Sequence, residues 1–242
     1  MQFRYDDIWR DMLALWKQHR AVAVPLLGVF AFLPAFAQLQ FIGPPTVKDL
    51  DMAGLKVVMA YYEANALPLV AVRLASLVGS AALIYTLLAS DGSSVGDALK
   101  RALLMLPSLF LLSVILSFAV TTGLFALIVP GLYLLARLLL SEPAMMLDKF
   151  YNPFDAMAKS LMMTAGQGWR VCGVFSIFAL GTYLAVQVVA ALATFVGNLL
   201  LPVEGMDVLS AALGALSTSA FALVIALLAA VLYRRLSASR GI

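Results

Sequence analysis

The sequence predicts an all-α, polytopic membrane protein with about six transmembrane helices in one domain, residues 1–242. Of its 242 residues, 63% are hydrophobic and only 12% are charged, whereas soluble domains are about 45–50% apolar and about 25% charged. Apolar runs long enough to cross a bilayer recur along the chain, and Lys and Arg gather in alternate loops. Too little polar surface is left to cover a soluble body, so lipid is the expected solvent.

The first two spans have clear limits. A helix that crosses the hydrocarbon core needs about 20 apolar residues. The stretch 21–42 meets this requirement and ends at Gly43-Pro44-Pro45, through which no helix continues. The next span is predicted over 64–90, where only Asn65 and Arg73 interrupt the apolar sequence.

Two longer runs each predict a pair of spans. The run 102–147 exceeds one crossing, and Thr121-Thr122-Gly123 is the expected turn because polarity and backbone freedom coincide there. The run 171–233 is broken at residues 202–207, which contain Pro202, Glu204, Gly205 and Asp207. The total is six spans.

The N-terminal segment also needs comparison with a signal peptide. Ala35-Phe36-Ala37 resembles a small-residue cleavage site. The preceding region is amphipathic and carries Asp6, Asp7 and Asp11, unlike a short basic leader. The segment is therefore interpreted as the first membrane span.

The orientation follows from the Lys and Arg residues, because cytoplasmic loops carry an excess of them. If the N-terminus, the second and fourth loops and the C-terminus share one side, that side holds Arg4, Arg10, Lys17, Arg20, Lys100, Arg101, Lys149, Lys159, Arg170, Arg234, Arg235 and Arg240. The other side holds only Lys48 and Lys56. Both termini are expected in the cytoplasm.

Three short segments that precede the three pairs of spans align with one another. Residues 7–13, 97–103 and 155–161 each begin with Asp and end with Leu, and each has apolar residues at helical spacing. A stripe of this kind, too short and too charged to cross, is typical of a helix lying in the membrane interface. We expect three cytoplasmic interfacial helices and a threefold internal repeat over 5–90, 94–147 and 153–235. The alternative is that short amphipathic helices resemble one another without being repeats.

Arg137, Arg73 and Glu142 are the candidate binding residues, for a lipid or another anion. An arginine at bilayer depth costs about 2.5–3.5 kcal/mol on insertion scales, so it normally faces protein, a cavity or water. The functional interpretation is a lipid phosphate or anionic substrate site. The structural interpretation is an arginine that bonds carbonyls freed at Pro130-Gly131. Glu142 lies on a different helix face from Arg137, so its partner is expected on another span or in the lipid headgroups.

A second group of residues is expected at the water boundary of the cytoplasmic face, where aromatic and basic side chains meet headgroups. These interfacial residues are Trp9, Trp16, Lys17, Arg20, Lys100, Arg101, Lys159 and Arg170. The expected partners are membrane lipids with anionic headgroups. No Lys/Arg run indicates nucleic acid. One cysteine, Cys172, and one histidine, His19, predict neither a metal site nor a cofactor. A homo-oligomer or a protein partner remains open.

Residues 129–170 resemble a known family. Val129-Pro-Gly-Leu-Tyr-Leu-Leu-Ala-Arg137, then Glu142-Pro143, then Asn152-Pro-Phe-Asp-Ala-Met-Ala-Lys-Ser160 are similar to six-span bacterial inner-membrane proteins of the YciC type. They are also similar to the membrane domain fused to some glycerophosphodiester phosphodiesterases. The resemblance implies a bacterial inner-membrane protein with a role in envelope or lipid homeostasis. It implies no catalytic site, because the phosphodiesterase chemistry belongs to a separate soluble barrel.

Three functions compete. The first is a non-enzymatic membrane module that organises lipid or a protein partner through its basic face. The second is a transporter or channel for a small or lipidic solute, with Arg73 and Arg137 lining the path. The third is an intramembrane enzyme, for which the sequence shows no catalytic constellation. Transporters usually have inverted repeats and interrupted helices, whereas the repeats expected here are parallel.

Overall fold

The structure is a computed structural model that describes residues 5–45, 51–89, 94–126, 128–200 and 202–240. Within these ranges the chain forms helices and no strands, which confirms the all-α prediction. Five helical segments of the described chain are long and apolar enough to cross a membrane, namely Tyr5–Phe41, Ala66–Leu88, Leu106–Gly123, Gly168–Leu200 and Gly205–Ser239. The protein is therefore a multi-pass integral membrane protein, and the six predicted spans compare with five such segments in the described ranges.

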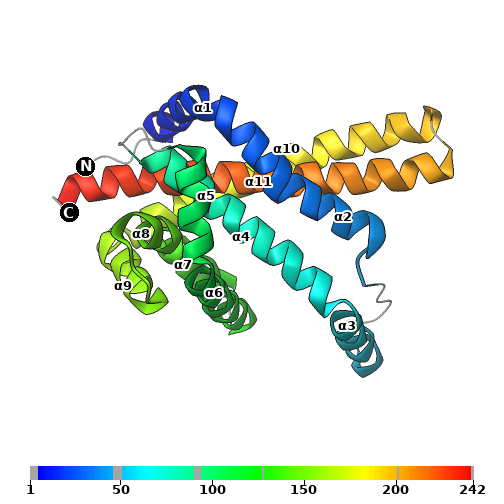
Figure 1. Cartoon of the computed structure of the whole chain (residues 1–242), viewed down its shortest axis with the longest axis horizontal. Coiled ribbons are helices and arrows are strands. Elements are labelled where there is room, and N and C mark those ends of the chain that lie inside the picture. Colours follow the sequence, from blue (N-terminus) through cyan, green and yellow to red (C-terminus); the bar gives the residue numbers. More distant parts are fainter. Residues whose placement is uncertain (1–4, 46–50, 90–93, 127, 201, 241–242) are drawn as a thin grey trace.

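The first predicted span lies in a continuous helical segment made of α1 (Tyr5–Leu27), the π-helix η1 (Gly28–Phe32) and α2 (Leu33–Phe41). Pro34 explains the π-helix, because it has no N–H for the carbonyl of Phe30 and its ring crowds that carbonyl. Gly43, with φ +68°, follows the end of α2. The amphipathic start of this segment is not a separate helix, although its first turns run at an angle to the rest (Figure 1).

The second span is α4 (Ala66–Leu88), close to its predicted limits. It is preceded by α3 (Met52–Ala64), which was not predicted and which begins at Asp51, whose carboxylate accepts from the Gly54 N–H at 2.7 Å. At Gly79 any Cβ would collide with the Cβ of Phe30. Glycine is therefore required where η1 packs on α4.

The second unit begins with α5 (Val95–Leu104), a separate short helix. Its N-terminus is a capping box, in which Ser94 and Asp97 exchange side-chain and backbone hydrogen bonds. The hydrogen bonds from Ser94 hold the pKa of Asp97 below its usual value. After Met105 the chain turns into α6 (Leu106–Ala126), which continues through the predicted turn at 121–123. That turn prediction was wrong, because lipid favours a helix whose backbone groups bond internally.

The predicted fourth span is broken into two short helices, α7 (Ile128–Leu138) and α8 (Ser141–Asp148). At 1.5 Å per residue, the 11 residues of α7 are about 16 Å long, too short to cross about 30 Å of hydrocarbon. The α6–α7 hairpin is tight, since a Cβ at Gly123 would lie 2.9 Å from the Cα of Gly131. Figure 1 shows α6 nearly end-on, across the direction of α10 and α11.

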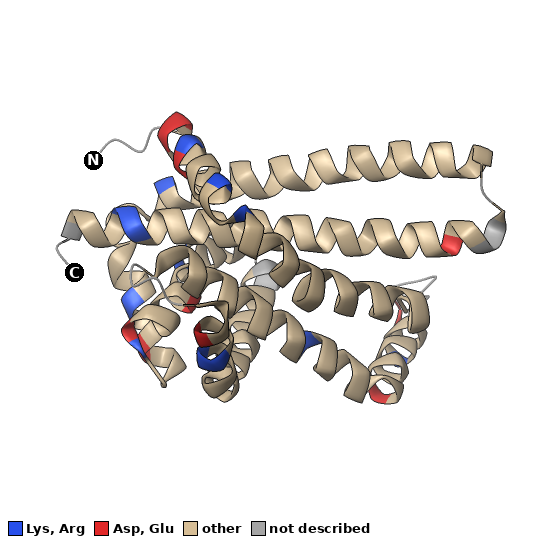
Figure 2. Cartoon of the chain, turned by 45° about the horizontal axis from the view of Figure 1, so that its top comes forward, with Lys and Arg blue, Asp and Glu red and all other residues tan. Residues whose placement is uncertain are grey.

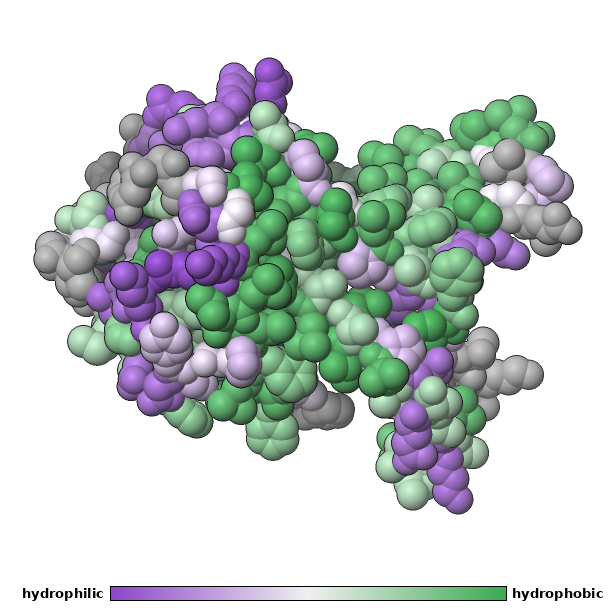
Figure 3. Space-filling model, in the orientation of Figure 1, coloured by the Kyte–Doolittle hydropathy of each residue, from purple (hydrophilic) through white to green (hydrophobic). Residues whose placement is uncertain are grey.

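The third unit contains α9 (Pro153–Met163), α10 (Gly168–Leu200) and α11 (Val203–Arg240). The break between α10 and α11 lies near Pro202, as predicted. With 33 and 38 residues, these helices are about 50 and 57 Å long. They form a hairpin whose far part projects beyond the other helices with its apolar surface exposed (Figures 1 and 3).

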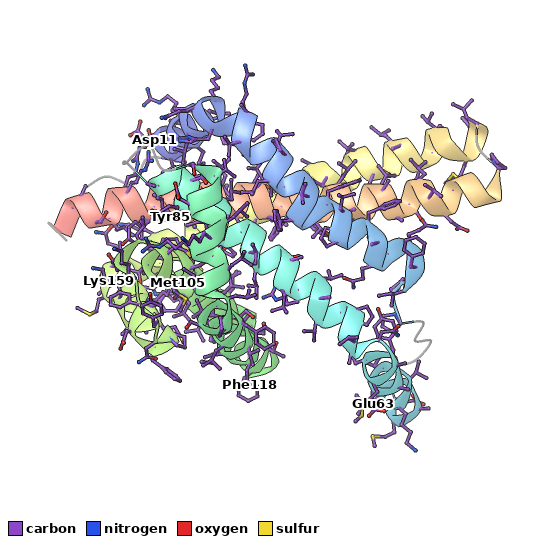
Figure 4. All side chains as sticks on the ribbon, viewed as in Figure 1. Asp11, Glu63, Tyr85, Met105, Phe118 and Lys159 are labelled. Atoms are coloured by element: carbon purple, nitrogen blue, oxygen red, sulfur yellow. The ribbon has the colours of Figure 1, made fainter. Side chains whose placement is uncertain are left out.

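Charged residues gather at one end of the molecule, where α1 begins and α11 ends (Figure 2). We call this the charged end. Asp11, Tyr85 and Lys159 lie there, whereas Glu63 of α3 lies at the opposite end (Figure 4). The α6–α7 hairpin stops well short of that opposite end along the long axis (Figure 1). The helices α6 and α7 therefore do not extend to the side on which the six-span prediction placed the turn of this hairpin.

The core also lies toward the charged end and includes the fully buried side chains Ile8, Leu83, Leu87, Leu140, Met145, Met163, Leu228 and Leu232. The three aligned segments enter this core in the same register. The residues one, five and eight positions after Asp7, Asp97 and Asp155 are all at most 4% exposed: Ile8, Met12 and Leu15; Ala98, Ala102 and Met105; Ala156, Ser160 and Met163. This regularity is what a repeat requires, while the threefold relation of the whole units stays a prediction.

Candidate functional site

The break between α7 and α8 determines how the candidate residues are placed. Pro143 has no N–H for the carbonyl of Leu139, and its ring clashes with that carbonyl in a continuous helix. The chain turns at Leu139 and Leu140 and restarts at Ser141. Arg137 therefore lies at the end of α7 and Glu142 at the start of α8, so the two side chains leave different helices in different directions.

Arg137 binds the C-terminal end of α9. Its Nη2 donates to the carbonyl of Leu161 at 2.6 Å, and its Nε donates to Oγ1 of Thr164 at 3.1 Å. The last carbonyls of a helix lack partners within the helix, and a cation is stabilised there by the helix dipole. In return, Ser160 Oγ donates to the backbone carbonyl of Arg137 at 2.6 Å. The acceptors of Arg137 are therefore groups at the end of α9, and not the carbonyls at Pro130-Gly131 that the structural interpretation expected.

An aromatic pair covers the same arginine. The Arg137 guanidinium lies 5.8 Å from the centre of the Tyr133 ring, and Tyr133 contacts Trp169 with ring centres 4.8 Å apart. At Gly168 any added Cβ would collide with the hydroxyl of Tyr133, so the chain at the start of α10 fits closely against α7. Trp169 itself is 67% exposed. Arg137 is thus partly buried and held by protein groups, and the exposed Trp169 ring contacts the tyrosine beside it.

Glu142 is held by α4, which confirms the prediction that its partner lies on another span. Its Oε1 accepts from Ser80 Oγ at 2.6 Å. Arg73 lies about two helical turns before Ser80 on α4. The side chain of Arg73 is exposed and makes no hydrogen bond within the described part of the chain. The neighbouring Ser141 is fully buried, and its hydroxyl has no partner there either.

The predicted interfacial residues lie on α1, α5, α9 and the start of α10, at the charged end. Lys17, Arg20, Lys100 and Arg170 are exposed, and Trp9 is 51% exposed. The other three are partly buried. Trp16 packs against the core, Arg101 lies over the Tyr85 ring at 4.9 Å, and Lys159 pairs with Asp148 at 3.8 Å. The structure therefore leaves four of the six cations free to face headgroups.

Sequence reasoning missed the contacts that join the two ends of the chain. Arg235 donates to Oδ2 of Asp11 through Nε at 2.7 Å and through Nη2 at 2.5 Å. Arg234 donates to the carbonyl of Leu87 at the end of α4. Tyr233 donates to Asp148 at 2.9 Å. The only signal in the sequence was the Arg234-Arg235 pair after the last span, which was interpreted as topological.

Comparisons with protein families, with curated proteins and with solved structures find no match for this chain. The residues that the structure describes contain no group of three or more His, Cys, Asp or Glu side chains that could hold a metal ion. The candidate residues supply hydrogen-bond donors and acceptors. Arg137 and Glu142 use theirs on protein, while the exposed cations of the charged end and the exposed Arg73 have donors to spare.

Proposed function

We propose that this integral membrane protein is a non-enzymatic module that binds anionic lipid headgroups through its charged end. The proposal places it in the bacterial inner membrane with both termini in the cytoplasm. The resemblance to YciC-type proteins is part of the proposal and rests on the sequence alone. The single observation that carries the proposal is that Lys17, Arg20, Lys100 and Arg170 are exposed on α1, α5 and the start of α10, while charged residues gather at the charged end (Figure 2).

The apolar side chains beside these cations support the same function. Trp9, Leu103, Leu104, Phe154 and Trp169 are between 51% and 68% exposed. Four of them extend from α1, α5 and α10, which also carry the cations, and Phe154 extends from α9. Exposed aromatic and apolar side chains next to Lys and Arg are the composition of a surface that lies at the headgroup level. In water the same side chains would be a costly apolar patch.

Lipid retention tests the proposal. The full chain, purified as wild type and as Lys17→Gln/Arg20→Gln, is reconstituted in phosphatidylcholine with phosphatidylglycerol, and bound phosphatidylglycerol is counted by native mass spectrometry. A basic residue near an anionic surface contributes about 1 kcal/mol, so retention should fall more than tenfold. Lys56→Gln, at the opposite end, is the control and should change nothing. Equal retention in all three proteins would exclude the charged end as the lipid site.

The orientation has its own test. A reporter that is active only in the cytoplasm should work when fused after Ile242 or within residues 91–97, and should fail at Lys48 or Glu204. Activity at Glu204 and none at Ile242 would reverse the proposed topology.

A transporter is the second candidate, and one observation favours it. The α7–α8 break places a carboxylate, Glu142, beside an interrupted helix, an arrangement found in secondary transporters. A carboxylate that couples transport to protons would be sensitive to Glu142→Gln. Solute or proton flux into proteoliposomes that Glu142→Gln abolishes, at unchanged lipid retention, would favour this function over the first.

A further inference from the structure

A small, half-open cavity with polar and apolar walls lies between the start of α1 and the end of α11, at the charged end. It has a volume of about 190 Å³ and is lined by four residues of α1 and three of α11. Its polar walls are Asp11 and Gln18 on one side and Arg234 and Arg235 on the other. Pockets for drug-sized ligands have about 300–1,000 Å³. This cavity therefore suits a small polar group and not a whole lipid or a large solute.

The cavity contains unused donors and one unused acceptor. Both hydrogen bonds from Arg235 to Asp11 end on Oδ2, so Oδ1 has no hydrogen bond within the described part of the chain. Arg234 uses only one Nη on the Leu87 carbonyl. The exposed amide of Gln18 bonds no described group. Two guanidinium groups with free N–H groups suit a phosphate, and a free carboxylate oxygen suits an ammonium group.

We infer that this cavity binds the headgroup of a phospholipid that carries both a phosphodiester and a primary ammonium group. Arg234, Arg235 and Gln18 bind the phosphate oxygens, and Oδ1 of Asp11 accepts from the ammonium group. The inference rests on the proposed function, because it takes lipid headgroups as the ligands of the charged end. It adds a selectivity between headgroups without net charge, which a diffuse basic surface does not have.

The surface beside the cavity favours a lipid over a free phosphate compound. On α1, Ala21, Val22 and Pro25 follow Gln18 at spacings of three, four and seven residues, which places them on the same side of the helix. All three are exposed or partly exposed. This row of apolar side chains leads from the cavity toward the membrane-crossing part of α1. An acyl chain can follow it while the headgroup stays in the cavity.

Competition between phosphatidylethanolamine and phosphatidylcholine tests the inference. The two headgroups have the same net charge, but the choline group donates no N–H hydrogen bond. The full chain is exposed to an equimolar mixture in detergent, and bound lipid is counted by native mass spectrometry. One charge-assisted hydrogen bond corresponds to about a tenfold preference for phosphatidylethanolamine in the wild type. Asp11→Ala should remove this preference while total retention is kept, because Arg235 is then free for the phosphate.

Variants of the opposite wall complete the test. Arg234→Gln/Arg235→Gln should lower retention of both lipids at least tenfold. Gln18→Ala, which leaves both arginines and the ion pair intact, should lower it by a smaller factor and serves if the double variant does not fold. Arg10→Gln is the matched control, since Arg10 lies on the same helix and pairs with Asp7 outside the cavity. It should match the wild type.

Three results would overturn the inference. They are the absence of a phosphatidylethanolamine preference in the wild type, a preference that survives Asp11→Ala, and a loss of lipid retention in Arg10→Gln as large as that in Arg234→Gln/Arg235→Gln. Displacement by soluble phosphoethanolamine at the same concentration as the lipid would assign the cavity to a free ligand and overturn the lipid assignment. The proposed function is judged separately, by phosphatidylglycerol retention in Lys17→Gln/Arg20→Gln. Either test can therefore fail without the other.

Discussion

Arg137 and Arg73 share one sequence signature, an arginine inside an apolar helical run, yet their surroundings differ. Arg137 lies at the end of α7, bonded to Leu161 and Thr164 beneath the Tyr133 ring. Arg73 lies on α4 with its side chain exposed and without a hydrogen bond among the described residues. The difference teaches that burial of an arginine depends on a helix end that presents carbonyls to it, and α9 ends beside only one of the two.

The largest expected effect is the loss of Arg137. Arg137→Leu leaves the α9 carbonyl and the Thr164 hydroxyl without their donor, which should lower the free energy of unfolding by about 3 kcal/mol. Arg137→Lys should lose more than half as much stability as Arg137→Leu, because an ammonium group lacks the planar fork that reaches both acceptors. Thermal unfolding of the purified proteins measures this, with co-purified lipid counted in parallel. Unchanged stability with loss of an anionic lipid would replace the structural role by a binding role.

The next effect concerns the hydrogen bond from Ser160 of α9 to the backbone carbonyl of Arg137. Ser160→Ala removes the donor to the Arg137 carbonyl, which is then unpaired in a buried place, and should cost about 1–2 kcal/mol. The double variant Arg137→Leu/Ser160→Ala should cost less than the sum of the single variants, because both contacts join α7 to the same helix. Chemical or thermal unfolding provides the four values of this cycle. Strict additivity would mean that the two contacts act independently.

A smaller effect is expected at Glu142. Ser80→Ala removes its hydrogen-bond donor and should destabilise the protein by about 1 kcal/mol. Ser80→Ala/Glu142→Leu should regain most of this loss, because a pair of apolar groups needs no partner. The same unfolding assay measures the stability of both variants. If the double variant is less stable than either single variant, Glu142 has a further partner that the contact with Ser80 does not explain.

Arg73→Leu should have the smallest effect, within about 0.5 kcal/mol, because no described group loses a hydrogen bond. Insertion should be unimpaired or improved, since an arginine at membrane depth is unfavourable. Unfolding temperature and membrane yield, compared with Arg137→Leu, give the measurement. A loss as large as that of Arg137→Leu would remove the contrast between the two arginines.

The sequence by itself determined that the protein is helical and lies in a membrane, and it placed a predicted span in each of the five segments that are long and apolar enough to cross. These features depend on local composition. A segment in lipid needs apolar side chains and a backbone whose polar groups bond one another within the segment. It also determined that Arg137 needs acceptors and that Glu142 needs a partner on another helix. The buried register shared by residues 8, 98 and 156 follows from the same local periodicity.

The tertiary structure alone decided which groups meet. Leu161 and Thr164 reach Arg137, Ser80 reaches Glu142, and Asp11 pairs with Arg235 across 224 residues of sequence. The break at Pro143 was visible as a proline, but the apolar run around it was equally compatible with a kinked span. Pairings between distant segments depend on how helices cross, and composition does not encode crossing angles. The cavity between α1 and α11 exists for that reason only in the folded chain.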